Sequence, residues 1–364
     1  MTIPKSWRFG GPPTAVHQFH PVLAPGDAMS AHVFALRDRL REWGHASEAY
    51  AVEAKPGVEG VLPYRRLFRT LKPTDLLLMH FSMGHEVFDQ LAKVQARKVL
   101  VYHNVTPPEF FTGVNDHAAV HARLGLRQLA GLANHVDLAI GVSEFDRNDL
   151  AEIGFGNTTT VPILIDWARY EVTPDDSVLA ALSRPRPRIL FVGRISPNKR
   201  QDELIRMIAY YRGCIDPDVQ LFLVGSYRDQ PRYHARCVAL RDALDLASSV
   251  TFTGPVSTEA LVAYYRRATV FLSLSEHEGF GVPLLESMYL GLPVVAYDAA
   301  AVGETLDGGG LKLHRKDLPE AAEACALVAE RADLRERLVA AGHRRVRDFA
   351  SDAVAQRTKE ALGL

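Results

Sequence analysis

Short apolar segments alternate with helical segments along the chain, and this alternation occurs twice. In the amino-terminal half, apolar runs predict strands at 15–19, 47–52, 75–80, 98–103, 137–142 and 158–161. In the carboxyl-terminal half, they predict strands at 188–192, 220–224, 250–252, 270–274, 293–296 and 311–313. Strands that alternate with helices over short spacers are typical of parallel, doubly wound sheets. The sequence therefore predicts an α/β protein with two parallel, doubly wound sheets.

Length and periodicity indicate where the chain divides. A chain of 364 residues is long for one hydrophobic core and fits two domains of ordinary size. The periodicity breaks between 162 and 188, where prolines and aspartates at 174–176 and 184–187 favour turns. We expect an amino-terminal domain at 1–165 and a carboxyl-terminal domain at 166–350.

Composition excludes several classes of protein. The net charge of -1 gives no reason to expect nucleic acid as a partner. The three cysteines, Cys214, Cys237 and Cys325, lack the paired spacing of a disulfide framework or a zinc site. No apolar run approaches the roughly 20 residues that span a bilayer, and the first residues lack the apolar segment of a signal peptide. We expect a cytoplasmic protein.

The segment 273–286 carries the strongest functional signal. It follows a predicted strand and leads directly into a predicted helix. Gly279 and Gly281 flank Phe280, so main-chain N–H groups can approach an anion without a Cβ atom in the way. The first N–H groups of a helix and the helix dipole also favour phosphate. This segment therefore predicts a phosphate-binding turn.

Two carboxylates flank that turn. Glu278 lies in the loop, and Glu286 lies one helical turn beyond Val282 on the same face of the helix. A nucleotide sugar needs such a pair, because one acid can bind the sugar and the other the ribose. In the alternative interpretation this is an ordinary strand–loop–helix joint. Pro283 and Gly291 are then start and stop signals of the helix, and both carboxylates are solvated.

A second segment, 189–202, supplies positive charge. An apolar strand ends at Gly193, and Arg194 and Lys199 follow. Arginine can bind two phosphate oxygens as a fork, and lysine acts as a point charge. Together they could neutralise a departing diphosphate, so no metal site is expected. The alternative is a solvated basic loop formed with Arg200. Both segments follow the carboxyl ends of predicted parallel strands, and open α/β sheets bind ligands at these ends.

The two segments together resemble family 4 glycosyltransferases, which are retaining enzymes with two Rossmann domains (the GT-B fold). The resemblance covers nearly the whole chain, and its motifs are less diagnostic in the amino-terminal half. It is carried by Gly193-Arg194, Lys199, Gly279-Phe280-Gly281 and the Glu-x7-Glu pair of Glu278 and Glu286. Arg200 is a departure, because many members have glycine there. A side chain at 200 alters the turn but should not remove the Lys199 cation.

The resemblance implies a fold and an activity. The two domains would face each other across a cleft, and a final helix at 351–364 would cross back to the amino-terminal domain. The enzyme would transfer a hexose from a UDP- or GDP-sugar to a hydroxyl of a saccharide, lipid-linked or small-molecule acceptor. Such enzymes are usually metal-independent. Their retention is usually explained by attack on the face that the leaving group occupies, which requires no protein nucleophile.

The resemblance also implies roles for single residues. Arg194 and Lys199 would hold the diphosphate, Glu278 would contact the sugar, and Glu286 would accept hydrogen bonds from the ribose. Main-chain groups would also bind the donor at Gly193, Gly279, Phe280, Gly281 and Val282.

Two residues of the amino-terminal half complete the predicted site. His103 ends a strand, and in the family a histidine in a similar place contacts the donor sugar, so we expect a positioning or polar stabilising role. The alternative is a histidine that caps a strand end. Gly26 lies in a segment that resembles the family's loop that contacts phosphate or the acceptor. In the alternative interpretation, this segment is only the turn that leads into the helix at 30–43. Three other histidines end or line predicted strands: His17, His20 and His80.

Other patterns allow more than one interpretation. A basic segment, Arg65, Arg66, Arg69 and Lys72, could touch an anionic membrane at its inner face, or form a solvated helix face. Asp216-Pro217-Asp218 matches a metal-binding pattern but is better explained as a turn before a strand. Two other functions stay open. One is a nucleotide-sugar epimerase or phosphorylase of the same fold, and the other is an inactive nucleotide-sugar-binding protein.

Overall fold

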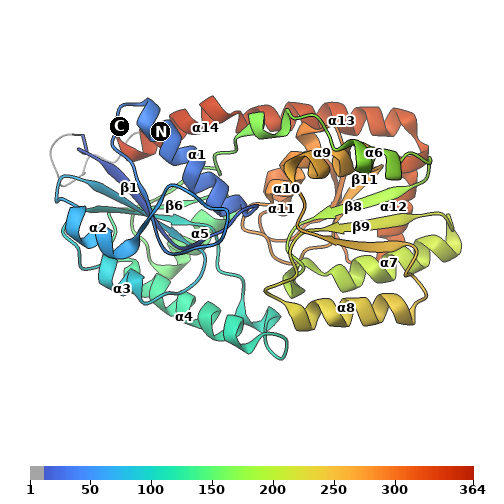
Figure 1. The fold of residues 1–364 in the computed structure, drawn as a ribbon, viewed down its shortest axis with the longest axis horizontal. Coiled ribbons are helices and arrows are strands. Elements are labelled where there is room, and N and C mark those ends of the chain that lie inside the picture. Colours follow the sequence, from blue (N-terminus) through green and yellow to red (C-terminus); the bar gives the residue numbers. More distant parts are fainter. Residues whose placement is uncertain (1–11) are drawn as a thin grey trace. The chain divides into compact units, whose positions relative to one another are not determined.

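A computed structural model describes residues 12–364, which form two compact units (Figure 1). Residues 1–11, part of the predicted domain 1–165 and of the segment searched for a signal peptide, lie outside the described residues. The first unit runs to Glu109 and includes His117–Asp166 and Phe349–Leu364. The second unit consists of Phe110–Asp116 and Trp167–Asp348. The last residues of the chain thus belong to the first unit.

The first unit is built on a parallel sheet. Within residues 12–364, this sheet has seven strands in the order β3-β2-β1-β4-β5-β6-β7. The strands are β1 Val16–Leu23, β2 Ala49–Ala54, β3 Val61–Pro63, β4 Leu76–Phe81, β5 Arg97–Tyr102, β6 Leu138–Gly141 and β7 Thr158–Thr160. The central strand β4 has no exposed side-chain area from Leu76 to Met79. Such a continuous apolar run is typical of a parallel strand that is covered on both faces.

Helices supply that cover. They are α1 Ala28–Glu42, α2 Tyr64–Thr70, α3 Val87–Leu91, α4 Asp116–Leu132, α5 Glu144–Ile153 and α14 Ser351–Leu362, with the short 3-10 helix η1 Pro108–Phe110. In Figure 1, α1 and α3 lie on opposite faces of the sheet. The carboxyl-terminal α14 is joined to this unit by polar contacts. The Ser351 hydroxyl donates to the Ile165 carbonyl at 2.7 Å, and Asp352 pairs with Arg39 at 3.1 Å.

The second unit repeats this architecture. Its described parallel sheet has six strands in the order β10-β9-β8-β11-β12-β13. The strands are β8 Arg188–Val192, β9 Gln220–Val224, β10 Val250–Gly254, β11 Val270–Ser273, β12 Val294–Tyr297 and β13 Leu311–Leu313. Buried side chains of β8 and β9, such as Phe191 and Leu223, pack with Leu204 and Ile208 in one core cluster.

The helices of the second unit follow its strands in turn. They are η2 Trp167–Tyr170, α6 Asp176–Ala181, η3 Pro197–Lys199, α7 Gln201–Cys214, α8 Pro231–Ala243, α9 Thr258–Arg267, α10 Val282–Tyr289, α11 Val302–Leu306, α12 Leu318–Glu330, α13 Ala332–Val346 and η4 Arg347–Phe349. Figure 1 shows α8 and α9 on opposite faces of the sheet. The predicted fold class of two Rossmann-like α/β domains is confirmed.

Candidate functional site

The loop after β11 contains the turn that its glycines predicted. Gly281 has a φ of 90° and is the N-cap of α10. A Cβ atom at this position would lie 2.8 Å from Cδ1 of Leu284. Both the left-handed backbone and the lack of space therefore favour glycine. Among the described residues, no side chain caps the amino end of α10. Pro283 has no N–H, and Leu284 donates its N–H to the carbonyl of Gly281 at 3.0 Å, so Val282 supplies the N–H at the start of α10 that can face an anion.

Hydrogen bonds join this loop to the loop after β8. The N–H of Glu276 donates to the carbonyl of Asn198 at 2.9 Å. The side-chain amide of Asn198 donates to the carbonyl of His277 at 3.1 Å, across 79 positions of sequence. Asn198 is buried, and β8 and β11 are neighbouring strands. The two segments that the sequence singled out therefore lie side by side at the carboxyl-terminal edge of one sheet.

The predicted phosphate cation and the predicted sugar-binding carboxylate contact each other. Lys199 forms an ion pair with Glu278, and their side chains are only 19% and 15% exposed. Arg194 is exposed, and within residues 12–364 no ion pair involves it. The structure thus brings Lys199 and Glu278 together and leaves the Arg194 guanidinium open to a ligand.

Arg200 occupies the position where the resembling family often has glycine. Its φ of 53° lies in the left-handed region, which glycine adopts without strain. The guanidinium contacts Glu276 at 3.0 Å, Glu203 at 2.6 Å and Asp202 at 3.3 Å. Burial lowers the pKa of Arg200, but the carboxylates of Asp202 and Glu203 outweigh burial and raise it. Lys316 also contacts Glu276, at 2.8 Å. The Glu276 carboxylate is therefore held in a charge cluster.

Glu286 is buried and bound by two tyrosines. The hydroxyl of Tyr265 donates to one carboxylate oxygen at 2.6 Å, and the hydroxyl of Tyr170 donates to the other. Burial and the nearby carboxylate both raise the pKa of Tyr265. Glu286 thus links η2, at the start of the second unit, to α9 and α10. Neither tyrosine belongs to the site that the sequence predicts.

Gly193 lies where two loops of the second unit approach closely. Its N–H donates to the carbonyl of Val224 at 2.9 Å. A Cβ atom on Gly225, which has a φ of 142°, would lie 2.2 Å from the carbonyl oxygen of Gly193. The glycine at 225 therefore lets the loops after β8 and β9 pack main chain against main chain.

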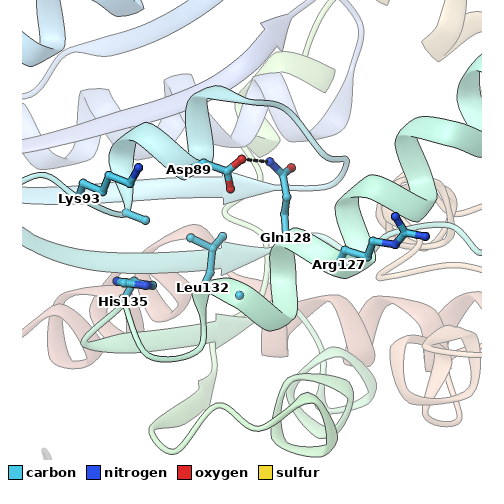
Figure 2. Close-up of a pocket in the computed structure, with 8 residues that line it drawn as sticks. Asp89, Lys93, Arg127, Gln128, Leu132 and His135 are labelled. Atoms are coloured by element: carbon cyan, nitrogen blue, oxygen red, sulfur yellow. Dashed lines mark hydrogen bonds between the residues drawn. The ribbon is translucent and has the colours of Figure 1, made fainter.

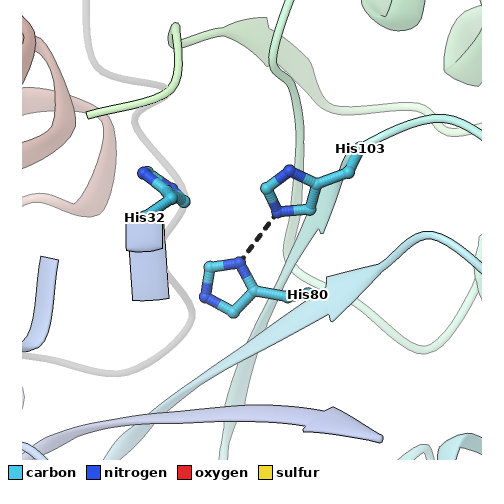
Figure 3. Close-up of side chains that lie close together, drawn as sticks. All are labelled: His32, His80 and His103. Atoms are coloured by element: carbon cyan, nitrogen blue, oxygen red, sulfur yellow. Dashed lines mark hydrogen bonds between the residues drawn. The ribbon is translucent and has the colours of Figure 1, made fainter. Parts of the chain in front are cut away.

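The remaining predicted site residues lie in the first unit. His103 directly follows β5, and its Nε2 lies 3.0 Å from Nδ1 of His80 (Figure 3). Gly26, with a φ of 72°, forms the turn between β1 and α1. The next residue, Asp27, caps α1 by accepting from the N–H of Ser30 at 2.9 Å. Both predicted residues follow the carboxyl ends of parallel strands.

Two other predicted patterns have simple structural explanations. Asp216 accepts from the N–H of Asp218 at 2.8 Å, the contact of an aspartate-led turn. In α2, Arg65, Arg66 and Arg69 are exposed. Among residues 12–364, no helix has both the length and the hydropathy needed to cross a bilayer.

The first unit also has a surface pocket of about 300 Å³ between α3 and α4 (Figure 2). Asp89 and Gln128 line it and form a hydrogen bond of 2.9 Å. A second pocket, of about 360 Å³, lies beside η3 in the second unit and includes Arg200, Arg206 and Arg236. Neither pocket contains a residue that the sequence analysis assigned to the site.

Comparison with known proteins identifies relatives of parts of the chain. Residues 180–345 match the family described as glycosyl transferases group 1. The GDP-mannose-dependent alpha-(1-6)-phosphatidylinositol monomannoside mannosyltransferase of Mycobacterium tuberculosis (strain CDC 1551 / Oshkosh) is 29% identical over 231 residues, 59% of this chain and 57% of that protein. The D-inositol 3-phosphate glycosyltransferase of Streptomyces griseus is 34% identical over 184 residues, 47% of this chain and 38% of that protein. The matches thus span little more than half of these relatives at most.

Solved structures resemble the chain over nearly its full length. Sucrose-phosphate synthase from Thermosynechococcus elongatus has a TM-score of 0.76 at 20% identity, with 95% of this chain and 98% of that chain covered. HepE from Anabaena, in complex with UDP and glucose, has a TM-score of 0.76 at 18% identity, with 96% and 99% covered. At these identities the likeness shows the fold. The chain therefore has the GT-B fold, and residues 180–345 within it match the glycosyl transferases group 1 family.

Proposed function

We propose that this chain is a retaining glycosyltransferase. It would move a hexose from a nucleotide-diphosphate sugar to a hydroxyl of a saccharide, lipid-linked or small-molecule acceptor. The observation that carries the proposal is the junction of the loops after β8 and β11. It gathers Lys199, Glu278 and the amino end of α10 at one edge of a sheet. One relative is named as GDP-mannose-dependent, and one solved neighbour is a complex with UDP-glucose. These names support UDP or GDP as the nucleotide.

Arg194 and Lys199 are proposed to hold the donor diphosphate. In the free protein, Lys199 and Glu278 neutralise each other in a half-buried ion pair. A diphosphate would replace the carboxylate as the partner of Lys199, and Glu278 would then be free to accept hydrogen bonds from the sugar. The exposed Arg194 would add a bidentate contact to the phosphate oxygens.

Main-chain groups and the second carboxylate are proposed to complete donor binding. The N–H groups from Gly279 to Val282 would bind phosphate and sugar oxygens at the amino end of α10. Each oxygen of Glu286 accepts one tyrosine hydroxyl and retains capacity for another donor, such as a ribose hydroxyl. Gly193 and Gly26 would allow close approach of main chain to the donor, and His103 would position the sugar.

The proposed chemical step needs no nucleophile from the protein. The bond between the anomeric carbon and the diphosphate oxygen breaks, and a bond to the acceptor oxygen forms on the same face. The acceptor proton passes to an oxygen of the departing diphosphate. Arg194 and Lys199 would stabilise the negative charge that develops on that group. No metal ion is expected to take part.

The test is a transfer assay with UDP- and GDP-sugars. Lys199→Ala should abolish transfer, because the departing diphosphate loses its cation, whereas Arg232→Ala removes an exposed cation of α8 and should not alter the rate. EDTA should leave the wild-type rate unchanged, and the product should keep the anomeric configuration of the donor. Wild-type rates in Lys199→Ala would contradict the assignment of this residue. Inversion, or inactivation by EDTA, would contradict the proposed mechanism.

We also propose peripheral contact between α2 and an anionic membrane. Arg65, Arg66 and Arg69 are exposed on this helix with Phe68, and Lys72 follows it. Exposed cations beside an exposed aromatic ring suit an anionic interface. The protein should sediment with vesicles that contain phosphatidylserine and not with neutral vesicles, and glutamine at the four basic positions should abolish this binding.

A further inference from the structure

A chain of hydrogen bonds within the first unit leads from a main-chain carbonyl to His103. The side-chain amide of Gln18 donates to the carbonyl of Val33 at 2.9 Å. The amide oxygen of Gln18 lies 2.9 Å from Nε2 of His80. Nδ1 of His80 lies 3.0 Å from Nε2 of His103 (Figure 3). Gln18 and His80 have no exposed area, so these polar atoms depend on one another for partners.

This arrangement fixes which atom donates and which accepts in each of the three hydrogen bonds that lead from Val33 to His103. A carbonyl can only accept, so the nitrogen of the Gln18 amide faces Val33 and its oxygen faces His80. The oxygen also can only accept, so Nε2 of His80 carries a hydrogen. Burial, followed by the nearby imidazoles of His103 and His32, holds the pKa of His80 well below its usual value. Neutral His80 therefore has a lone pair on Nδ1, which accepts from the Nε2–H of His103.

His103 is left with one unsatisfied acceptor atom. Burial, followed by the nearby His32 and His20, holds the pKa of His103 well below its usual value. A neutral imidazole with its hydrogen on Nε2 has its lone pair on Nδ1. That Nδ1 atom is buried and has no hydrogen-bond partner among residues 12–364. Because buried polar atoms rarely lack partners, this atom is open to a donor from outside the described residues.

A metal ion is the competing explanation for these histidines. His32, His80 and His103 offer nitrogens that lie within 4.8 Å of one another. However, Nδ1 of His32 accepts from the N–H of Leu164 at 2.9 Å. His32 is neutral near pH 7, because burial lowers its pKa to about 4. Its Nε2 must then carry a hydrogen and cannot ligate a metal. The contact between His80 and His103 likewise needs a hydrogen between the two nitrogens.

We propose that Gln18 and His80 are positioning residues that hold His103 as its Nε2–H tautomer, so that Nδ1 accepts a hydrogen bond from a hydroxyl group of the sugar substrate. The assignment of a sugar as the ligand rests on the proposed function. Under this proposal, His103 selects a ligand that donates a hydrogen bond. It does not act as a proton donor in the reaction.

The tautomer is tested by nuclear magnetic resonance on protein with ¹⁵N-labelled histidine, without any ligand. We expect His80 and His103 to carry their hydrogens on Nε2. In His80→Asn, an amide oxygen can replace the Nδ1 acceptor, and His103 should keep its tautomer. In His80→Leu, that acceptor is lost, and His103 should populate both tautomers. The wild-type spectrum alone shows which nitrogen of His103 carries the hydrogen, even if the leucine variant does not fold. Hydrogen on Nδ1 of wild-type His103 would overturn the proposal.

The ligand is tested by adding UDP-glucose, GDP-mannose, UDP and GDP separately to the same labelled protein. We expect the Nδ1 resonance of His103 to shift with a nucleotide sugar that binds and to remain in place with UDP or GDP alone. An equal shift with the nucleotide alone would overturn the hydroxyl contact. Binding of one Zn²⁺ that is lost in His32→Gln would favour the metal explanation instead. Failure to bind any of the four compounds would refute the proposed function, whereas the tautomer measurement would stand independently.

Discussion

At the scale of single residues, the candidate site combines positions that a motif specifies with partners that it does not. The spacing of the two carboxylates identified Glu278 and Glu286 from sequence. The partners of Glu286 come from positions 170 and 265, and only the packing of η2 and α9 brings them to it. No periodic pattern distinguishes Tyr265 from its neighbour Tyr264. The tyrosine contacts therefore could not be predicted.

Those contacts give Glu286 a structural role beside the proposed ribose contact. Glu286→Ala removes the acceptor that two buried tyrosine hydroxyls share, so we expect the free energy of unfolding of the second unit to fall by roughly 2–5 kcal/mol. Tyr265→Phe removes one hydroxyl and keeps the carboxylate, and should cost about 1 kcal/mol. Urea unfolding measures both changes, and calorimetry with UDP and GDP measures binding. A Glu286→Ala variant as stable as wild type would contradict the structural role.

At the scale of elements, predictions were most accurate for buried strands. Sequence placed β8, β9 and β13 at their observed bounds, because each is a short, mostly apolar segment between turns. The sequence predicted that β1 ends at residue 19, because His20 and Pro21 interrupt the apolar run. In the structure the strand continues to Leu23. The sequence missed β3, an edge strand of three residues that ends in proline and has no buried side chain.

The close approach of the loops after β8 and β9 makes a prediction about glycine. A Cβ atom at position 225 would lie 2.2 Å from a carbonyl oxygen, at a φ of 142°. A main-chain carbonyl cannot move aside as easily as a side chain can. Gly225→Ala should therefore destabilise the second unit by about 3 kcal/mol or more. Gly213 lies in α7 with open space around it. Gly213→Ala should therefore add about 0.5–1 kcal/mol.

Thermal and urea unfolding of both alanine variants measure these effects. Equal stability of Gly225→Ala and wild type would show that the two loops do not require this close contact.

At the scale of the whole molecule, the sequence predicted two parallel-sheet units, because the alternation of strand and helix recurs in each half. Because ligands bind at the carboxyl ends of parallel strands, it also predicts that the loops after β8 and β11 carry function, and the structure places these two loops side by side. The sequence did not predict the histidine cluster of the first unit. His20 lies within β1, His80 within β4, His103 directly after β5 and His32 in α1, and only the strand order β1-β4-β5 makes them neighbours.

These buried histidines make the stability of the first unit depend on pH. Burial lowers the pKa of His20 and His32 to about 4 and holds the pKa values of His80 and His103 well below normal. Unfolding returns each pKa to about 6.5, so the unfolded chain binds more protons than the folded chain below that pH. Stability should therefore fall as the pH drops from about 6.5 toward 4, by at most about 1.4 kcal/mol per pH unit for each histidine.

Chemical denaturation between pH 7 and pH 5 measures this dependence. His32→Gln should reduce the slope of the free energy of unfolding against pH, because one of the four titrating histidines is removed. A free energy of unfolding that stays constant over this interval would show that the four imidazoles are not buried in their neutral form.

The central claim is that Arg194, Lys199 and the amino end of α10 together bind the diphosphate of a nucleotide sugar. A crystal structure of the protein with UDP-glucose or GDP-mannose tests it most directly. We predict phosphate oxygens within hydrogen-bond distance of the Arg194 guanidinium, Nζ of Lys199 and the N–H groups from Gly279 to Val282, with Glu278 released from Lys199 and bound to the sugar. A ligand with its diphosphate elsewhere, and the Lys199–Glu278 ion pair intact, would contradict the account.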